Sequence, residues 1–188
     1  MKGVLVAILC LLLLVGAGMA YVFWPHGVPR DGSAQPTNSY SFDALGVSFL
    51  YPGTYAFESY PLEDEEGAWQ EFVLIRKTDK IAAEQNGASE GPVSITIGIF
   101  PNTAGVGLEE WVRSTKHSNF HLSMDQKFSA SQMGGQQSLS YRYTGLYEVD
   151  ATAVVWKGQV YVISVGWVDS TDSIRADYAT LLKTVSFK

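Results

Sequence analysis

The sequence predicts an α+β domain, in which helices pack against a central antiparallel sheet. Three observations predict this class. Strand-like segments dominate residues 40–188, two segments have the 3.6-residue period of an amphipathic helix, and two β-rich arms meet at Lys157-Gly158. Because each helix has one apolar face to bury, an antiparallel sheet covered by helices satisfies both.

Residues 1–24 are predicted to form a transmembrane signal anchor. Residues 3–24 carry no charge, and 22 residues at about 1.5 Å each cross a hydrocarbon core of about 30 Å. Lys2 precedes this run, and the rings that end at Trp24 suit the membrane interface. The small residues before Tyr21 leave a cleaved signal peptide as the alternative. The domain is therefore expected outside the cytoplasm, on a single-pass anchor or secreted after cleavage.

Residues 25–39 are rich in Pro, Gly, Ser and Asn and have no apolar period, which predicts a flexible tether. Residues 40–188 then have the usual size of one domain. Cys10 is the only cysteine and lies in the apolar run, so the domain cannot form an internal disulfide.

Strands are predicted in chain order by short apolar or alternating runs. The run at 71–76 is expected to end at a break formed by Lys77-Thr78-Asp79, and 151–168 is expected to be a hairpin of central strands that turns at Lys157-Gly158. The other predicted strands are 47–51, 93–99 and 139–143.

Two helices are predicted. In residues 108–117 the apolar face contains Leu108, Trp111 and Val112, with acidic residues near the start and Lys116 and His117 near the end. The second helix lies near the C-terminus and is expected to be capped by Ser170 or Thr171. Its stripe consists of Ile174, Tyr178, Leu181 and Leu182.

The order of these elements resembles the PsbP-like family. The resemblance rests on residues 45–52, the helix start Leu108-Glu109-Glu110-Trp111, the Gly134-Gly135 hairpin, the strand at 158–168 and the terminal segment 181–187. It implies an αβα sandwich over residues 40–188, as in the Mog protein, and a membrane-anchored bacterial member. PsbP proteins assist oxygen evolution by photosystem II, but these motifs are structural, so neither that role nor any binding residue follows from them.

Charge and motifs exclude several classes of function. The 13 Lys and Arg residues are outnumbered by 19 Asp and Glu residues, which makes nucleic acid an unfavourable partner. The sequence contains no G-x-S-x-G motif, and its glycine pairs do not form a phosphate-binding fingerprint. No catalytic residue and no cofactor are expected.

Two groups are weak candidates for metal ligands. His117 and His121 would share a face if both were helical, and the acidic run at 63–66, which contains Glu63 and Asp64, could hold Ca²⁺ weakly. The run lacks the spacing of a calcium loop, and nothing nearby completes a site for the histidines. We expect independent surface features: a histidine at a helix end, a loop histidine and a self-repelling solvated loop.

Aromatic residues are the candidates for partner binding. Tyr55 and Tyr60 belong to a cluster that either is exposed or fills the core, and Trp69 is the aromatic residue expected to be most exposed. The predicted function is a membrane-tethered extracytoplasmic binding or assembly accessory domain, without enzymatic activity, for another protein of the envelope. The alternatives are a hydrolase or metal-dependent enzyme, which needs a concave pocket with convergent polar groups, and a small-ligand sensor.

Overall fold

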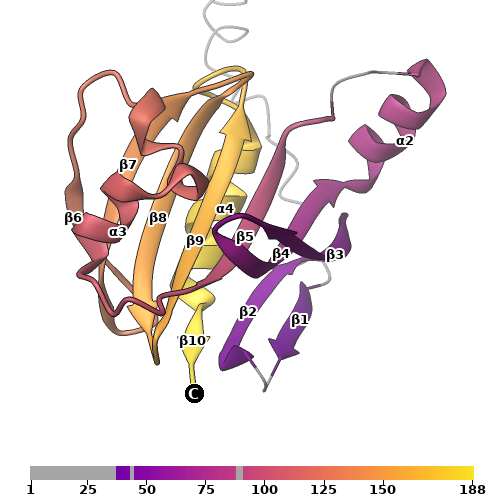
Figure 1. The fold of residues 1–188 in the computed structure, drawn as a ribbon. Coiled ribbons are helices and arrows are strands. Elements are labelled where there is room, and N and C mark those ends of the chain that lie inside the picture. The colour runs from indigo at the N-terminus through magenta and orange to yellow at the C-terminus, as the bar shows by residue number, and fades with distance from the viewer. Residues whose placement is uncertain (1–36, 43–44, 88–90) are drawn as a thin grey trace, which may run out of the picture. The chain divides into compact units, whose positions relative to one another are not determined.

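The computed structural model describes residues 37–42, 45–87 and 91–188, whose strands form two antiparallel sheets (Figure 1). The predicted anchor and most of the predicted tether lie outside these residues. Strand β1 (Thr37–Phe42) begins inside the range predicted as tether, so the sheet begins earlier than expected. None of the helices in the described residues has the length and apolarity that crossing a bilayer requires.

The smaller sheet has the order β1–β2–β10, with β2 (Val47–Pro52) in the centre and β10 (Ser186–Phe187) at the C-terminal end. The predicted strand at 47–51 is therefore confirmed. Val47 and Phe49 are buried, and the Lys188 N–H donates to the Gly46 carbonyl at 3.0 Å. The chain end is thereby tied to the beginning of β2.

The larger sheet has the order β3–β4–β5–β9–β8–β7–β6, and every neighbouring pair is antiparallel. The predicted strands at 71–76 and 139–143 lie within β4 and β7, and the strand predicted at 93–99 corresponds to β5, which begins one residue later. The bounds are β3 (Tyr55–Asp64), β4 (Gly67–Arg76), β5 (Ser94–Pro101), β6 (Ser129–Met133), β7 (Gln136–Thr144), β8 (Glu148–Trp156) and β9 (Gln159–Trp167).

The β8–β9 hairpin lies in the middle of this sheet, as predicted. Lys157 and Gly158 have φ values of 46° and 74°, the positive values that a tight two-residue turn requires. The strands it joins pair from Trp156↔Gln159 to Glu148↔Trp167. The two-residue turn thus sets the register in which β8 and β9 pair.

Helix α4 (Ser173–Thr184) covers one face of the larger sheet together with the smaller sheet. Ile174, Tyr178 and Leu181 are buried, as the predicted stripe requires. The predicted cap is wrong, because Asp172 caps the helix by accepting the Ile174 N–H at 3.0 Å. The layer on this face is thus part helix and part sheet, which departs from a simple αβα sandwich.

Helix α3 (Leu108–Ser114) covers the opposite face, with Trp111 and Val112 buried. It is shorter than predicted, because Thr115 is extended and ends it before His117. The short 3₁₀ turns η2 (Lys116–Ser118) and η3 (Phe120–Leu122) follow, separated by Asn119 in the left-handed conformation with φ 54°. His117 and His121 therefore do not share a helix face.

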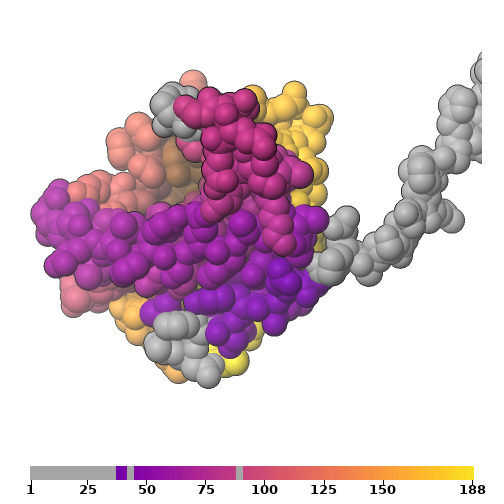
Figure 2. Space-filling view, turned by 90° about the vertical axis from the view of Figure 1, so that its right-hand side faces the viewer, coloured from indigo at the N-terminus to yellow at the C-terminus, as the bar shows by residue number. Residues whose placement is uncertain are grey.

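Helix α2 (Lys77–Asn86) begins where a break was predicted. None of its residues is buried. A helix that packs no face against the core needs no apolar period, and this is why the sequence pattern did not indicate it. Arg76 lies 3.9 Å from Asp79, Lys80 pairs with Glu58 of β3, and Gly87 ends the helix with φ 59°. Figure 2 shows α2, in magenta, standing above the purple β3–β4 hairpin.

Candidate functional site

The acidic turn between β3 and β4 is fastened to η2. The Thr115 hydroxyl donates to Glu66 Oε2 at 2.6 Å, and Lys116 Nζ lies 3.1 Å from Asp64 Oδ2 and also pairs with Glu65. The hydrogen bond from Lys116 lowers the pKa of Glu65. The expectation of a self-repelling loop is therefore wrong, because Lys116 supplies a positive charge from a segment about fifty residues away.

His117 lies between two aromatic rings and beside the same acidic turn. Its ring centroid is 4.5 Å from that of Trp69 and 4.8 Å from that of Phe100. Its Nε2 lies 3.4 Å from Glu66 Oε2 and 3.7 Å from Asp64 Oδ2. His117 and the acidic run are therefore one cluster, not independent features.

Three aromatic side chains from three elements form the wall of a pocket. The Phe100 centroid lies 6.0 Å from that of Trp69 on β4 and 5.4 Å from that of Trp111 on α3. The Phe100 ring lies over Gly98, where a Cβ would come within 2.5 Å of Cε2 of that ring. The side chain missing at Gly98 is thus what allows Phe100 to lie here.

Asn102 holds the loop that leads from β5 to α3. Its Nδ2 donates to the Val106 carbonyl at 2.9 Å, and its Oδ1 accepts the Val106 N–H at 3.2 Å. Its own N–H donates to the Gly158 carbonyl at 2.9 Å, which ties the loop to the β8–β9 turn. This buried amide thereby sets the start of α3 and, with it, the position of Trp111.

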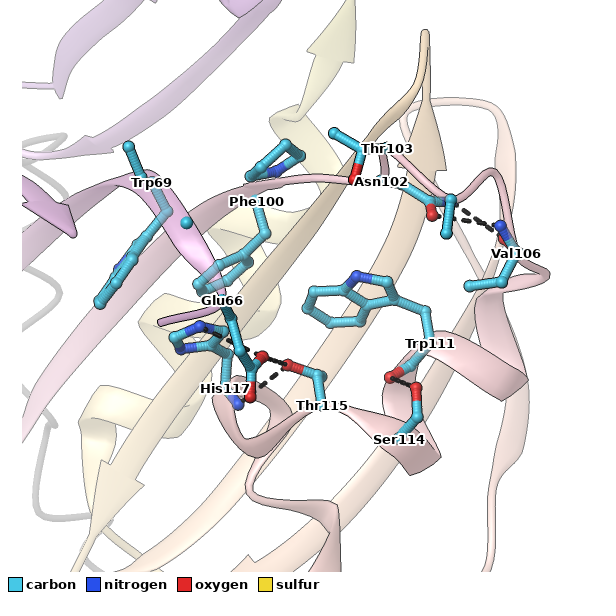
Figure 3. Close-up of a pocket in the computed structure, with 14 residues that line it drawn as sticks. Glu66, Trp69, Phe100, Asn102, Thr103, Val106, Trp111, Ser114, Thr115 and His117 are labelled. Carbon is cyan, nitrogen blue, oxygen red and sulfur yellow. Dashed lines mark hydrogen bonds and ion pairs between the residues drawn. The ribbon is translucent and has the colours of Figure 1, made fainter. Parts of the chain in front are cut away.

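We call the resulting cavity, of about 260 Å³, the aromatic pocket; it is lined by Glu66, Trp69, Phe100, Asn102, Trp111 and His117, among others. Figure 3 shows Glu66, His117 and Thr115 together at one end and Asn102 with Val106 at the other. The hydroxyls of Ser114 and Thr115 and the amide of Asn102 are already bonded within the protein. The pocket therefore offers aromatic surfaces to a ligand, and its polar groups mainly hold it in shape.

The fold brings two of the metal-ligand candidates, His117 and Asp64, together, but His121 and Glu63 are exposed. His121 is exposed on η3, whereas His117 packs inside the cluster. Glu63 is exposed at the end of β3, and Asp64 is engaged by Lys116. In residues 37–42, 45–87 and 91–188, no three His, Cys, Asp or Glu side chains are grouped so that they could hold a metal ion.

The candidate partner-binding residues lie in different environments. Tyr55 is 2% exposed and donates to Asp177 Oδ2 at 2.7 Å, so it does not lie on the surface. Tyr60 is 42% exposed and donates to Glu58. Trp69 is half-buried and is therefore not the most exposed aromatic residue. Of these three, Trp69 alone lines the aromatic pocket.

Sequence reasoning missed Phe100 and Asn102 as site residues, and it assigned Trp111 to the core alone. No local pattern identifies them, because they meet Trp69 and His117 only through sheet pairing and loop docking. The one local signal was Pro101-Asn102 directly after a predicted strand, which indicates a defined chain reversal.

No family model and no curated protein matches the sequence. Among solved structures, the solution structure of cyanobacterial PsbP (CyanoP) from Synechocystis sp. PCC 6803 is similar to this chain, with a TM-score of 0.51 and 15% sequence identity. The match covers 87% of this chain and 99% of that chain. The fold is PsbP-like. At this identity the likeness establishes the PsbP-like fold alone, and the chemistry of the site is argued from this chain's own residues.

Proposed function

We propose that residues 40–188 form a non-enzymatic binding or assembly accessory domain, held on the outer side of a cell membrane by residues 1–24. Its partner is another protein of the envelope, and the contact is made by the aromatic pocket. The observation that carries this proposal is that Trp69, Phe100 and Trp111 line a cavity in which the Asn102 amide and the hydroxyls of Ser114 and Thr115 already have partners.

The size of the pocket favours one side chain of a protein as its occupant. Its volume of about 260 Å³ lies below the roughly 300–1,000 Å³ of sites for drug-sized ligands. Aromatic residues in desolvated pockets are also those that carry most of the binding energy in protein interfaces. We therefore expect one apolar or aromatic side chain of the partner to enter between Trp69 and Trp111.

The arrangement favours binding over hydrolysis. A hydrolase needs a nucleophile within about 2.6–3.2 Å of a base that is free to take its proton. Thr115 lies within this distance of Glu66, at 2.6 Å, but its hydroxyl oxygen also accepts the His117 N–H at 3.2 Å and so caps η2. The Ser114 hydroxyl donates to the Trp111 carbonyl at 3.3 Å, and a carbonyl is not a base that takes its proton. The Thr115 hydroxyl thus links η2 to the β3–β4 turn, and the Ser114 hydroxyl bonds within α3.

Site-specific photo-crosslinking of the full chain in its native membrane tests this proposal. A benzophenone amino acid replaces Thr103, an exposed residue that lines the pocket, and a matched probe replaces Thr180, an exposed residue of α4. We expect one discrete crosslinked envelope protein from position 103 and none from 180. Trp69→Ala should strongly reduce that product, whereas equal products from both positions or an unaffected product would contradict the proposal.

A further inference from the structure

Glu71 lines a second cavity, which shares Phe100 and His117 with the aromatic pocket. Glu71 on β4 pairs with Gly98 of β5, and the neighbouring pair across β5 and β9 is Thr96↔Ser164. The cavity has a volume of about 240 Å³ and is lined by Glu71, Thr96, Asn119, Tyr143 and Ser164, with Phe100 and His117 as the wall that it shares with the aromatic pocket. We call it the Glu71 cavity.

The Glu71 carboxyl group has no partner among the residues that the structure describes. The one effect on its acidity is burial, which raises the pKa of Glu71, and no described donor or cation is paired with its oxygens. Other partly buried carboxylates in this domain are paired: Asp150 with Arg142 and Arg175, and Asp172 with Arg76. A half-buried carboxyl without a partner opposes folding and therefore needs an explanation.

The groups around Glu71 include several hydroxyl oxygens that can accept a hydrogen bond, and none of them is Lys or Arg. The Tyr143 hydroxyl interacts with Asn119, whose Nδ2 lies 3.4 Å away, and with Ser164. Thr96 and Ser164 add two hydroxyl oxygens, and none of the residues that line the cavity is Lys or Arg. An anion would meet an uncompensated carboxylate here, whereas a cation would meet its counterion.

We propose that the Glu71 cavity binds a primary ammonium group, with Glu71 as its counterion. The three N–H donors of such a group match the Glu71 carboxylate and the hydroxyl oxygens of Ser164 and Thr96. Phe100 and Tyr143 line the same cavity, and aromatic rings attract cations. The ammonium group comes either from a small free amine or from a lysine side chain of a protein.

This inference goes beyond the proposed function and can fail independently of it. Glu71, Thr96, Tyr143 and Ser164 line the Glu71 cavity but not the aromatic pocket, whereas Trp69 and Trp111 line the aromatic pocket alone. A Glu71 substitution therefore leaves the residues probed by crosslinking in place. Loss of ammonium binding with an unchanged crosslink, or the reverse, separates the two claims.

The test measures binding of n-butylammonium to the full chain in detergent micelles by isothermal titration calorimetry. 1-Butanol is the neutral isostere, and tetramethylammonium is a cation without N–H donors; all titrations use the same ionic strength. Glu71→Gln removes the charge at nearly constant volume. Glu110→Gln is the matched control, because Glu110 is exposed on α3 and does not line the cavity.

We expect n-butylammonium to bind more tightly than both control ligands. Glu71→Gln should weaken its binding by roughly 10- to 100-fold, the effect of losing a hydrogen bond to a charged group, and Glu110→Gln should leave it within about twofold. Competition by acetyl-Gly-Lys-Gly-amide would identify a lysine of a protein as the source of the ammonium group. If this peptide does not compete, the source is a free amine. Equal binding of 1-butanol, or binding that persists in Glu71→Gln, would overturn the proposal.

Discussion

Ionisation of Glu71 opposes folding, because its carboxyl group is half-buried and has no described partner. Burial raises the pKa of Glu71, so near that pKa the folded state binds more protons at this site than the unfolded chain does. The contribution of this group to stability is therefore complete below the pKa of an unfolded glutamate, about 4.3, and is lost as pH rises through the raised pKa.

We therefore expect Glu71→Gln, which cannot ionise, to melt at a higher temperature than the wild type at about pH 7. The gain should shrink at about pH 4, where both side chains are neutral. Thermal melts over this range measure the difference, and His117, Tyr143 and Tyr60, the titratable groups that face Glu71, remain in both proteins. A difference that does not change with pH would contradict this account.

The two histidines should respond differently to truncation. His117 packs between Trp69 and Phe100, so His117→Ala leaves a void and should lower the free energy of unfolding by about 2 kcal/mol. His121 is exposed, and His121→Ala should change it by less than about 0.5 kcal/mol. Urea denaturation measures both values.

We also expect no transition metal in stoichiometric amounts in the purified protein. A Zn²⁺-dependent rise in melting temperature that is lost in both histidine variants would restore the metal-site hypothesis.

At the scale of the element, α3 is held by its buried face. Trp111 and Val112 lie in the core under α3, so Trp111→Ala should destabilise the domain by roughly 3–5 kcal/mol. Glu109→Ala removes only an exposed pair with Arg113 at 2.9 Å, which is worth about 0.3–0.5 kcal/mol. Denaturant midpoints compare the two variants. Similar midpoints would show that α3 is not anchored through Trp111.

The start of α4 depends on Asp172, which also pairs with Arg76 at 2.9 Å. Although partial burial raises its pKa, the hydrogen bonds from the Ile174 N–H and Arg76 lower it below its usual value overall. We expect Asp172→Ala to cost about 1–2 kcal/mol at neutral pH, and less as pH falls through the lowered pKa, because Asp172 is then protonated. Asp172→Asn should retain most of the stability, since Asn caps a helix about as well as Asp. Equal losses for Ala and Asn would assign the effect to the ion pair alone.

At the scale of the whole molecule, the location of the domain depends on whether residues 1–24 are retained as an anchor, as the sequence predicts. Residues 1–24 stay a predicted anchor, and we expect the mature protein to remain with membranes after high-salt and carbonate washing, because hydrophobic insertion resists both treatments. Cell fractionation followed by N-terminal sequencing measures this. A mature N-terminus at Tyr21 would instead identify a cleaved signal peptide and a secreted domain.

The sequence by itself determined the fold class, the central hairpin and the buried faces of α3 and α4. Each of these features depends on neighbouring residues. Lys157-Gly158 provides the tight turn, and the buried residues of α3 and α4 follow the period of a helix. Burial against a sheet imposes such a period on neighbouring residues, so a single segment is enough to recognise it.

Only the tertiary structure decided where the site lies. Glu66 meets Thr115 across 49 positions of the chain, and Phe100 can lie over Gly98 only in the register that β5 adopts in the sheet. Helix α2 escaped prediction because it buries no side chain and therefore has no apolar period. In the sequence, nothing distinguishes Glu71 from other residues of a predicted strand. Whether it has a counterion depends on all the segments that pack around it, and only the tertiary structure shows these.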